Sequence, residues 1–461
     1  MKIEEIHIEG LFGEHDYHIP ITDNKLILVA ENGSGKTTIV NIIYYLLTRQ
    51  WNKLLRYNFI SLAVVVDHKE FKISRDEMDI LNSPKIQKYF KRYPKSIKEK
   101  LSDLLLNIDP FEIIKHPYKY EYTADRFGIP SHLLFEISNA LSHEQLTLFN
   151  EILPKRGKFL SNLIDSQILY LPTYRRIEQD LKNIFPDLES DIDKYRKRKR
   201  HREPNEGSYV ELVEFGMEDV EEKIKQRLNE LKEDLNNKLK TNLTGGYLKD
   251  VINRVYLDIS FKQIQTFKED ALSSILDRID ESVLSKQEKN KLIDFVNDVN
   301  QKGSIDKEEN KIIAYFIYRL SDIYNELMKE EEDIKKFVSI CNEFSGNKRF
   351  IYDNINFKIS IHPLVNNRVR KKDEILFKDL SSGEKQIVSL FSHIYLSRRK
   401  KFFVVIDEPE LSLSVPWQQR FLLDITNNQY CDGIIAVTHS PFIFENELEQ
   451  YAKALNSFIK R

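Results

Sequence analysis

The chain has 461 residues, with 70 lysines and arginines against 72 aspartates and glutamates, so its formal net charge is −2. A charged fraction of 31% beside a hydrophobic fraction of 41% is typical of a soluble globular protein and excludes a disordered or fibrous one, while near-neutrality excludes a general positive field for binding nucleic acid. Acidic residues at the very start and the shortness of every apolar run predict a cytoplasmic protein with no membrane partner.

The first part of the chain alternates between strand and helix patterns. Residues 3–8 and 25–30 have the alternating character of strands, and a glycine-rich loop follows the second of them. From Thr37 to Leu46 apolar residues recur at helical spacing, and residues 58–66 again predict a strand. A strand, a loop and a helix in this order form the unit that a phosphate-binding site needs.

The loop between that strand and that helix has the Walker A pattern, with Ala30 at its first glycine position. Glycines at 33 and 35 let backbone N–H groups converge on phosphate oxygens, and the helix start points its positive end at the same place. Lys36 is expected to bridge the β- and γ-phosphates of ATP, and the Thr37 hydroxyl to ligate Mg²⁺. A functionless glycine-rich turn is disfavoured by the position between strand and helix. The predicted nucleotide-binding residues here are Asn32, Gly33, Ser34, Gly35, Lys36, Thr37 and Thr38.

Residues from about 77 to 165 are predicted to be mostly helical, and a short apolar strand follows at 167–171. Just after this strand, Thr173 is a candidate ligand for metal-bound water. Arg175 and Arg176 are candidates for sensing phosphate or for contacting the next helical segment. A basic helix start on the surface explains the two arginines equally well.

A second helical stretch extends from about 177 to 346. An apolar stripe from Val220 to Leu239, at steps of three and four, predicts a helix that packs in a bundle and ends at the glycine pair 245–246. The basic cluster Lys194–Arg202 lies in the same stretch. It is either a nucleic-acid contact that neutralises several phosphates or an exposed linker, which the following segment Glu203–Gly207 favours.

Strand-like alternation at 349–361 ends the helical stretch, and a short motif follows. The segment Leu380–Gln386 reads LSSGEKQ. Ser381 and the backbone of Gly383 are expected at the N-terminus of a helix, facing an anion. Taken alone, the segment is also ordinary helix capping, because serine is a common N-cap residue.

An apolar strand at 402–406 carries two acids at its carboxyl end, where α/β sheets place their ligand chemistry. Asp407 suits the shell of a Mg²⁺ ion, and Glu408 suits a general base that polarises the attacking water. By itself this segment is better explained as an ordinary core strand that runs into a charged turn, but it does not stand alone. Farther along, 434–438 is another apolar strand, and His439 follows it directly.

In this order the motifs resemble those of ABC-type ATPases: Walker A, a variant of the LSGGQ signature, Walker B, a D-loop at 411–414 and a switch histidine. The resemblance implies that His439 hydrogen-bonds the γ-phosphate, and that Ser381 and Gly383 of one subunit close over ATP held by another copy of the chain. The signature departs from the family pattern at two positions, and the glutamine loop has no glutamine. The resemblance thus implies ATP and Mg²⁺ as cofactors, with Glu408, His439 and Lys36 as catalytic residues and Thr37 and Asp407 as metal ligands.

The expected fold is an α/β, ABC-type P-loop ATPase head of two lobes with large helical insertions, similar to the heads of RecF and Rad50. An N-terminal ATPase lobe is expected at 1–176 and a helical arm at 177–346. A C-terminal lobe with the signature, Walker B, D-loop and switch histidine is expected at 347–461. The strings DEPELSL from Asp407 and VTHSPF from Val437 resemble the OLD-like AAA15 branch of this group.

True OLD proteins carry a Toprim nuclease domain after the ATPase core, and none is expected here because 22 residues follow His439. An OLD-like ATPase without its nuclease resembles the ATPase subunits of the bacterial anti-phage systems PARIS and Septu. This resemblance implies an ATP-dependent sensor and scaffold that forms a dimer or higher oligomer and holds a toxic nuclease effector supplied by another chain. A phage-encoded protein is then a candidate trigger.

A DNA-repair ATPase that clamps DNA, similar to RecF or Rad50, is the alternative function. Stimulation of ATP hydrolysis by duplex DNA would favour it, whereas a neighbouring gene for a nuclease would favour the defence role. A transporter motor is disfavoured, because transporter nucleotide-binding domains are much shorter and carry only a small helical region.

Overall fold

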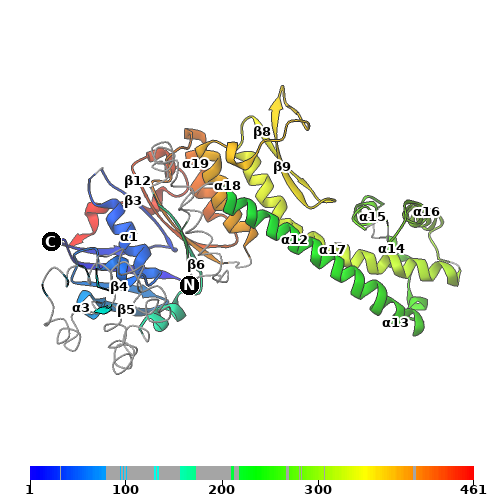
Figure 1. Ribbon diagram of the computed structural model, residues 1–461, viewed down its shortest axis with the longest axis horizontal. Helices are drawn as coiled ribbons and strands as arrows, with labels where there is room; N and C mark the ends of the chain where they lie inside the picture. Colours follow the sequence, from blue (N-terminus) through cyan, green and yellow to red (C-terminus); the bar gives the residue numbers. More distant parts are fainter. Residues whose placement is uncertain are drawn as a thin grey trace. The chain divides into compact units, whose positions relative to one another are not determined.

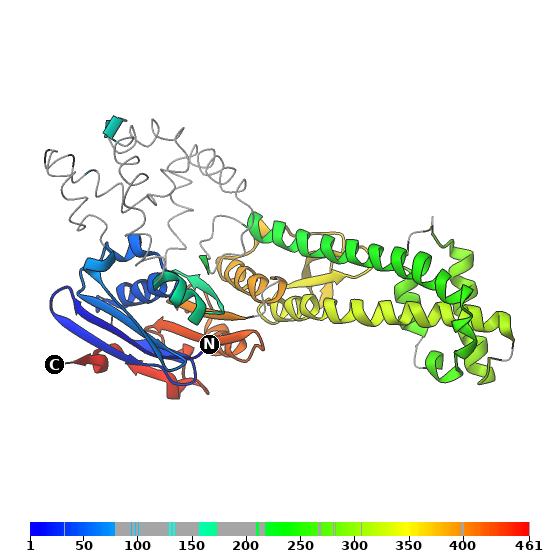
Figure 2. The same cartoon turned by 90° about the horizontal axis from the view of Figure 1, so that it is seen from below.

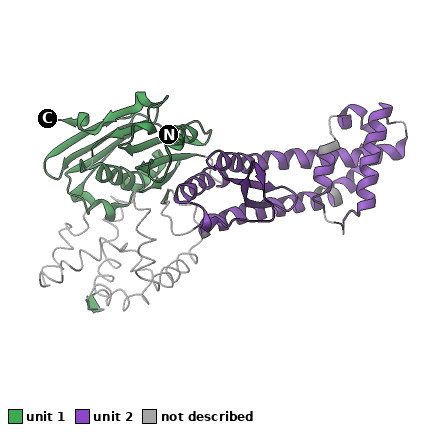
Figure 3. Cartoon of the chain, turned by 90° about the horizontal axis from the view of Figure 1, so that it is seen from above, with its two compact units in different colours: residues 1–213, 399–461 green, residues 214–398 purple. Residues whose placement is uncertain are grey.

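The computed structural model describes residues 1–31, 33–78, 156–172, 209–211, 217–265, 269–279, 281, 283–305, 307–397 and 401–460, with the single positions 94, 97, 100, 129, 130, 132 and 133. The chain forms two compact units (Figure 3). Unit 1 comprises residues 1–213 and 399–461, and unit 2 comprises residues 214–398. The first and last parts of the sequence therefore build one body together.

Unit 1 contains an antiparallel sheet of five strands in the order β14-β2-β1-β4-β5. Its strands are β1 (Ile3–Leu11), β2 (His15–Pro20), β4 (Ser61–Val66), β5 (Lys69–Ser74) and β14 (Ile459–Lys460). Along β1, Ile6 and Ile8 are fully buried, while the intervening His7 is only half-buried. One face of this sheet therefore packs on the core and the other meets solvent.

A second sheet of six strands, all parallel to their neighbours, has the order β13-β3-β12-β11-β6-β7. Its strands are β3 (Lys25–Val29), β6 (Gln167–Leu171), β7 (Tyr209–Glu211), β11 (Phe402–Asp407), β12 (Cys431–Thr438) and β13 (Ala452–Ala454). Every residue of β11 is buried, as expected for a central strand of a parallel sheet. This order brings the early strand β3 next to β12 (Figure 1). It also places β12 next to β11.

Helix α1 (Lys36–Leu47) joins the two sheets of unit 1 in one core. Its side chains Ile39 and Ile43 belong to the same buried cluster as Ile6 of the antiparallel sheet and Val405 of the parallel one. Burying one such side chain fully is worth roughly 1.5–3 kcal/mol, so this cluster fixes the helix against both sheets. The other helical elements described in unit 1 are α2 (Trp51–Leu54), α3 (Arg75–Met78), α19 (Val415–Thr426), η6 (Pro441–Ile443), η7 (Glu449–Tyr451) and η8 (Leu455–Phe458).

Unit 2 is built on two long helices, α12 (Glu218–Lys240) and α17 (Glu308–Glu343), which run side by side (Figures 1 and 2). Lys238 of α12 joins them, because its ammonium lies 3.2 Å from a carboxylate oxygen of Glu326 and 3.1 Å from one of Glu330. Further helices of this unit are η3 (Thr241–Gly246), α13 (Tyr247–Ile252), η4 (Val255–Asp258), α14 (Phe261–Gln265), α15 (Glu269–Leu276) and α16 (Lys286–Lys302).

The remainder of unit 2 is a three-stranded antiparallel sheet and a helix that packs on both long helices. These elements are β8 (Lys348–Asp353), β9 (Lys358–Val365), β10 (Arg368–Val369), η5 (Phe377–Asp379) and α18 (Ser382–Leu396). Among the helices, Arg278, which follows α15, forms a fully buried ion pair with Glu331 of α17 at 2.8 Å. The Tyr352 hydroxyl of β8 donates to the same carboxylate at 2.9 Å, which gives this buried charge a partner from the sheet.

The α/β P-loop ATPase fold with helical insertions is confirmed, but two details differ from the sequence prediction. The glycine pair 245–246 does not end the helical path, which continues through a π-helical turn into α13. The Tyr247 ring stacks against Tyr315 of α17, with ring centroids 6.1 Å apart, so tertiary packing overrides the glycine signal. The predicted lobe boundary at 346/347 does not coincide with the compact units, because α18 packs on α17 within unit 2.

The predicted helical insert at about 77–165 lies mostly outside the described residues. None of the helices in the described part of the chain combines the length and the hydropathy needed to span a bilayer.

Candidate functional site: a nucleotide site at the edge of the parallel sheet

The Walker A loop turns from β3 into α1 through two glycines in the left-handed region. Gly33 has φ of 82° and Gly35 has φ of 84°, a conformation that glycine adopts far more readily than other residues. A Cβ at either position would meet no atom within 4 Å, so backbone conformation rather than crowding requires glycine here. The Ser34 hydroxyl donates to the Glu31 carbonyl at 2.7 Å and closes the turn. The space beside both glycines is therefore open.

Lys36 is the first residue of α1, and it is buried. The ammonium donates to the Ala30 carbonyl at 2.8 Å, across the loop that it follows. A buried lysine beside an open glycine loop suits the binding of an anion, which would share this charge. Thr37 and Thr38 follow in the first turn of α1, and both are half-buried.

The two acids that the sequence predicts for Walker B lie where β11 ends: Asp407 is its last residue and Glu408 follows it. Asp407 is fully buried. The backbone then leaves the strand at once, because Glu408 has φ of 51° and its N–H donates to the Val437 carbonyl of β12 at 2.8 Å. A left-handed conformation costs a non-glycine residue roughly 1–2 kcal/mol. The two neighbouring acids therefore differ in backbone conformation, because Asp407 is the last residue of the strand and Glu408 lies outside it.

Electrostatics link Glu408 to residues from both ends of the sequence. Burial, followed by the negative charges of Asp407 and Glu410, raises the pKa of Glu408 above its ordinary value. The positive charges of His439 and Lys36 act in the opposite direction, so both lie close enough to influence this carboxyl. A glutamate with a raised pKa is suited to general-base work, because its basicity is greater than that of an exposed carboxylate.

Glu410 is a functional candidate to which the sequence assigned no role. It is nearly fully buried, and its carboxylate accepts hydrogen bonds from the Thr438 hydroxyl at 2.7 Å and from the His439 N–H at 3.0 Å. The same carboxylate lies 2.8 Å from Nδ1 of His439, whose side chain is 48% exposed. This contact places a proton on Nδ1 and leaves Nε2 to face away from Glu410.

The topology explains why Glu410 meets His439. The loop after β11 and the end of β12 are neighbours only because these two strands pair in parallel and finish at the same edge. The sequence signal for this contact is an acid two residues after the Walker B glutamate, together with a Thr-His pair at the end of a later strand. It becomes informative only when the strand order is known.

The signature segment forms the start of α18 in unit 2. Ser381 is its N-cap and Glu384 completes a capping box, because the Glu384 carboxylate accepts from the Ser381 N–H at 2.8 Å. Lys348 lies 2.6 Å from the same carboxylate. Ser381 and Ser382 are exposed, whereas Gly383 is buried. The structure therefore confirms the helix-capping interpretation. The glutamate that replaces the glutamine of the LSGGQ signature at position 384 has a structural reason, because it pairs with Lys348.

The structure thus brings Lys36, Glu408 and His439 to one edge of unit 1, with Asp407 and Glu410 beside them. Ser381 and Gly383 belong to unit 2, and their approach to a nucleotide stays a prediction. The other predicted candidates lie outside the described residues: Asn32, Thr173, Arg175, Arg176 and the basic cluster 194–202.

Comparison with known proteins identifies the type of domain. The sequence profile of the AAA_15 family, described as an AAA ATPase domain, matches residues 1–444. No curated protein matches the chain.

Two of the solved structures to which this chain is similar are Smc head domains. One has an extended coiled coil bound to the C-terminal domain of ScpA, derived from Pyrococcus furiosus. It is 14% identical, with a TM-score of 0.34, and the match covers 96% of this chain and 91% of that chain. The other has a coiled coil and joint, derived from Pyrococcus yayanosii. It is 14% identical, with a TM-score of 0.31, and the match covers 96% of this chain and 93% of that chain. At such TM-scores neither likeness bears on the function of this chain.

Proposed function

This chain belongs to the AAA_15 family of AAA ATPase domains, and on that premise we propose that it hydrolyses ATP as the sensor and scaffold subunit of a bacterial anti-phage system. The predicted AAA15 membership is confirmed by the family match, and ATP binding and hydrolysis follow from it. The observation that carries the assignment of residues is the convergence of Lys36, Glu408 and His439 at one sheet edge. The defence role rests on the resemblance of the motifs alone.

The residues at this edge suit Mg²⁺ and a triphosphate. The donor set of one hydroxyl and one carboxylate, from Thr37 and Asp407, consists of the hard oxygen ligands that Mg²⁺ prefers. Bound there, Mg²⁺ would neutralise charge on the phosphates. The open glycine loop and the Lys36 ammonium hold the phosphate chain, and the burial of Asp407 limits competing water.

In the reaction that we propose, Glu408 orients and deprotonates the attacking water. Its carboxyl has an environment that raises its pKa, and that makes it a better proton acceptor than an exposed glutamate. His439 contacts the γ-phosphate through Nε2, because Glu410 holds the other ring nitrogen. Lys36 stabilises the charge that develops on the transferred phosphoryl oxygens. The products are ADP and phosphate.

We also propose that a second copy of the chain completes each site. Ser381 and Ser382 are exposed at the N-terminus of α18, where backbone N–H groups and the helix dipole favour an anion. In the resemblance to ABC-type ATPases, this end of one subunit closes over ATP held by another. ATP would then join two copies, and hydrolysis would release them.

The nuclease effector in this proposal is a separate chain that the ATP-joined scaffold restrains until a phage product is sensed. The test is to express the chain with its neighbouring genes in bacteria and to measure phage plating. We expect protection that requires a neighbouring nuclease gene and is lost in both Lys36→Ala and Glu408→Gln. Lys69→Ala, which changes an exposed lysine of β5, is the matched control.

Two results would contradict the defence role. One is equal phage plating with and without the complete gene set. The other is ATP hydrolysis by the purified chain that duplex DNA accelerates at least tenfold while removal of the neighbouring gene has no effect. The second result would favour a DNA-clamping repair ATPase.

A further inference from the structure

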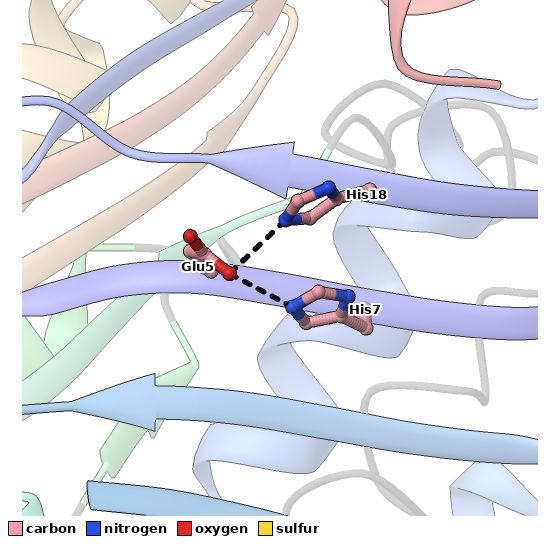
Figure 4. Close-up of side chains that lie close together, drawn as sticks. All are labelled: Glu5, His7 and His18. Carbon is pink, nitrogen blue, oxygen red and sulfur yellow. Dashed lines mark hydrogen bonds and ion pairs between the residues drawn. The ribbon is translucent and has the colours of Figure 1, made fainter. Parts of the chain in front are cut away.

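Two histidines and one glutamate converge on the solvent face of the antiparallel sheet. Figure 4 shows the rings of His7, from β1, and His18, from β2, both directed at the carboxylate of Glu5. The Nε2 atoms of His7 and His18 each lie 3.0 Å from the same Glu5 oxygen, Oε2. The two rings are stacked, with centroids 4.2 Å apart and planes inclined by 18°.

Strand geometry explains why these three side chains meet. Glu5 and His7 are two positions apart on β1, so they point to the same face, while Ile6 between them points into the core. His7 is the direct cross-strand partner of His18 in the antiparallel register. Ile6 in turn pairs with Ile19, which is also fully buried. The backbone of a paired sheet therefore fixes all three side chains on one rigid surface.

The cluster is open to an ion from solvent. The side chains of Glu5, His7 and His18 are 41%, 27% and 33% exposed, so each has one side in water and one side against the sheet. One ligand atom from each residue can be chosen such that all three lie within 4.8 Å of one another. Bonds of about 2.0–2.2 Å to a tetrahedral ion place its ligands roughly 3.4 Å apart, so the three side chains need only small rotations.

We propose that Glu5, His7 and His18 form a binding site for a divalent transition-metal ion of the zinc type, which links β1 to β2 on the outer face of the sheet. Two imidazole nitrogens and one carboxylate are a donor set that Zn²⁺, Ni²⁺ and Cu²⁺ accept readily. Mg²⁺ and Ca²⁺ prefer oxygen ligands throughout, so the ion that serves ATP does not compete here. A fourth position stays open to water.

The ion would replace the two hydrogen bonds that now join the histidines to Glu5. It would bind each Nε2, which requires the ring protons to sit on Nδ1, and the carboxylate would supply the negative charge. A metal that binds only the folded sheet stabilises it by mass action. The expected consequence is a higher melting temperature for the N-terminal sheet, with no direct part in ATP hydrolysis.

The chain offers two matched controls for a chance surface cluster. His15 is also exposed on β2, but its Nε2 lies 3.9 Å from Glu14 and it is not part of the cluster. Nδ1 of His68 lies 3.0 Å from Glu4, but this pair contains only one histidine. If surface histidines alone bound zinc, the loss of these two would matter as much as the loss of His7 and His18.

The test is equilibrium dialysis of the full nucleotide-free chain against micromolar Zn²⁺ with millimolar Mg²⁺ present, followed by elemental analysis. We expect the double variant His7→Gln/His18→Gln to bind about one zinc fewer per chain than the wild type, and His15→Gln/His68→Gln to bind as the wild type does. Zn²⁺ should raise the melting temperature of the wild type and of the control, and leave that of the His7/His18 variant unchanged. Anomalous diffraction at the zinc edge should place the ion at Glu5.

Equal zinc content in all three proteins would overturn the proposal, and so would an ion located elsewhere in an otherwise folded wild type. A second variant, Glu5→Gln, keeps the test decisive if the His7/His18 variant fails to fold. It keeps both rings and a side chain of the same shape, and we expect its zinc affinity to fall at least tenfold. An unchanged affinity in Glu5→Gln would likewise contradict a three-ligand site.

Discussion

The two halves of the proposed ATP site are built in opposite ways. In unit 1, Lys36 and Glu408 come from opposite ends of the sequence, and only the strand order of the parallel sheet brings them together. In unit 2, Ser381 and Glu384 are three residues apart and cap their own helix. The first half exists only when unit 1 is folded, whereas the second forms wherever α18 forms. Each half can therefore be disabled without disturbing the other, and the predictions below use this difference.

Removal of the Lys36 ammonium should have the largest effect on the convergent half. We expect Lys36→Ala to weaken ATP binding by about 100-fold or more, because charge-assisted hydrogen bonds are each worth roughly 1.5–3 kcal/mol and this lysine is expected to make them to two phosphates. Titration with a fluorescent ATP analogue measures the affinity. Lys69→Ala should bind as the wild type does. If Lys36→Ala and the wild type bound ATP with equal affinity, Lys36 would not be part of the ATP site.

Neutralising Glu408 should separate binding from hydrolysis. We expect Glu408→Gln to bind ATP with nearly unchanged affinity but to hydrolyse it roughly 10²-fold or more slowly, the usual contribution of a general base. Single-turnover kinetics with labelled ATP measure the rate. Glu445→Gln, on the exposed surface of unit 1, is the control. If Glu408→Gln hydrolysed ATP at the wild-type rate, Glu408 would not be the general base.

Glu410 should act through His439, because it holds the Nδ1 side of that ring. We expect Glu410→Gln to lower kcat about tenfold with little change in the affinity for ATP, since a neutral amide cannot accept all three donors that the carboxylate now serves. A double-mutant cycle gives the sharper answer. Glu410→Gln should cost nothing further in a His439→Ala background. Additive losses would mean that Glu410 contributes by another route.

The smallest effect concerns stability and its dependence on pH. The folded-state pKa of Glu408 is raised, so its ionised form costs stability at neutral pH, and that cost disappears as falling pH protonates the carboxyl. We therefore expect Glu408→Gln to melt at a higher temperature than the wild type at pH 7, with a difference that vanishes below the ordinary glutamate pKa of 4.5. A difference independent of pH would contradict the proposed environment of this carboxyl.

Local motifs were predictable from the sequence, and contacts between distant strands were not. The Walker A loop and the acids at the end of β11 have fixed spacings and a required order of strand, loop and helix, so Lys36, Asp407 and Glu408 could be named beforehand. Glu410 could not be given a role, because its partner lies on a neighbouring strand. The cluster of Glu5, His7 and His18 likewise depends on a cross-strand register that a single sequence does not reveal.

The same distinction applies to the ends of helices. Ser381 and Glu384 have the spacing of a capping box, and the structure contains one. The glycine pair 245–246 has the composition of a helix end, yet the path continues, because Tyr247 packs on α17. Capping needs only neighbours in sequence, whereas continuation past a glycine depends on what the next residues contact.

The central claim is that ATP held by one copy is enclosed by the signature of a second copy, and mixing two inactive variants tests it most directly. Lys36→Ala disables the nucleotide loop, and Ser382→Arg blocks the exposed end of α18 without removing the Ser381 cap. Each alone should be inactive. In an equimolar mixture half of the dimers are mixed, and each mixed dimer has one intact site of two, so we predict about a quarter of wild-type ATP hydrolysis. Hydrolysis that stays at the level of the separate variants at every mixing ratio would contradict the claim.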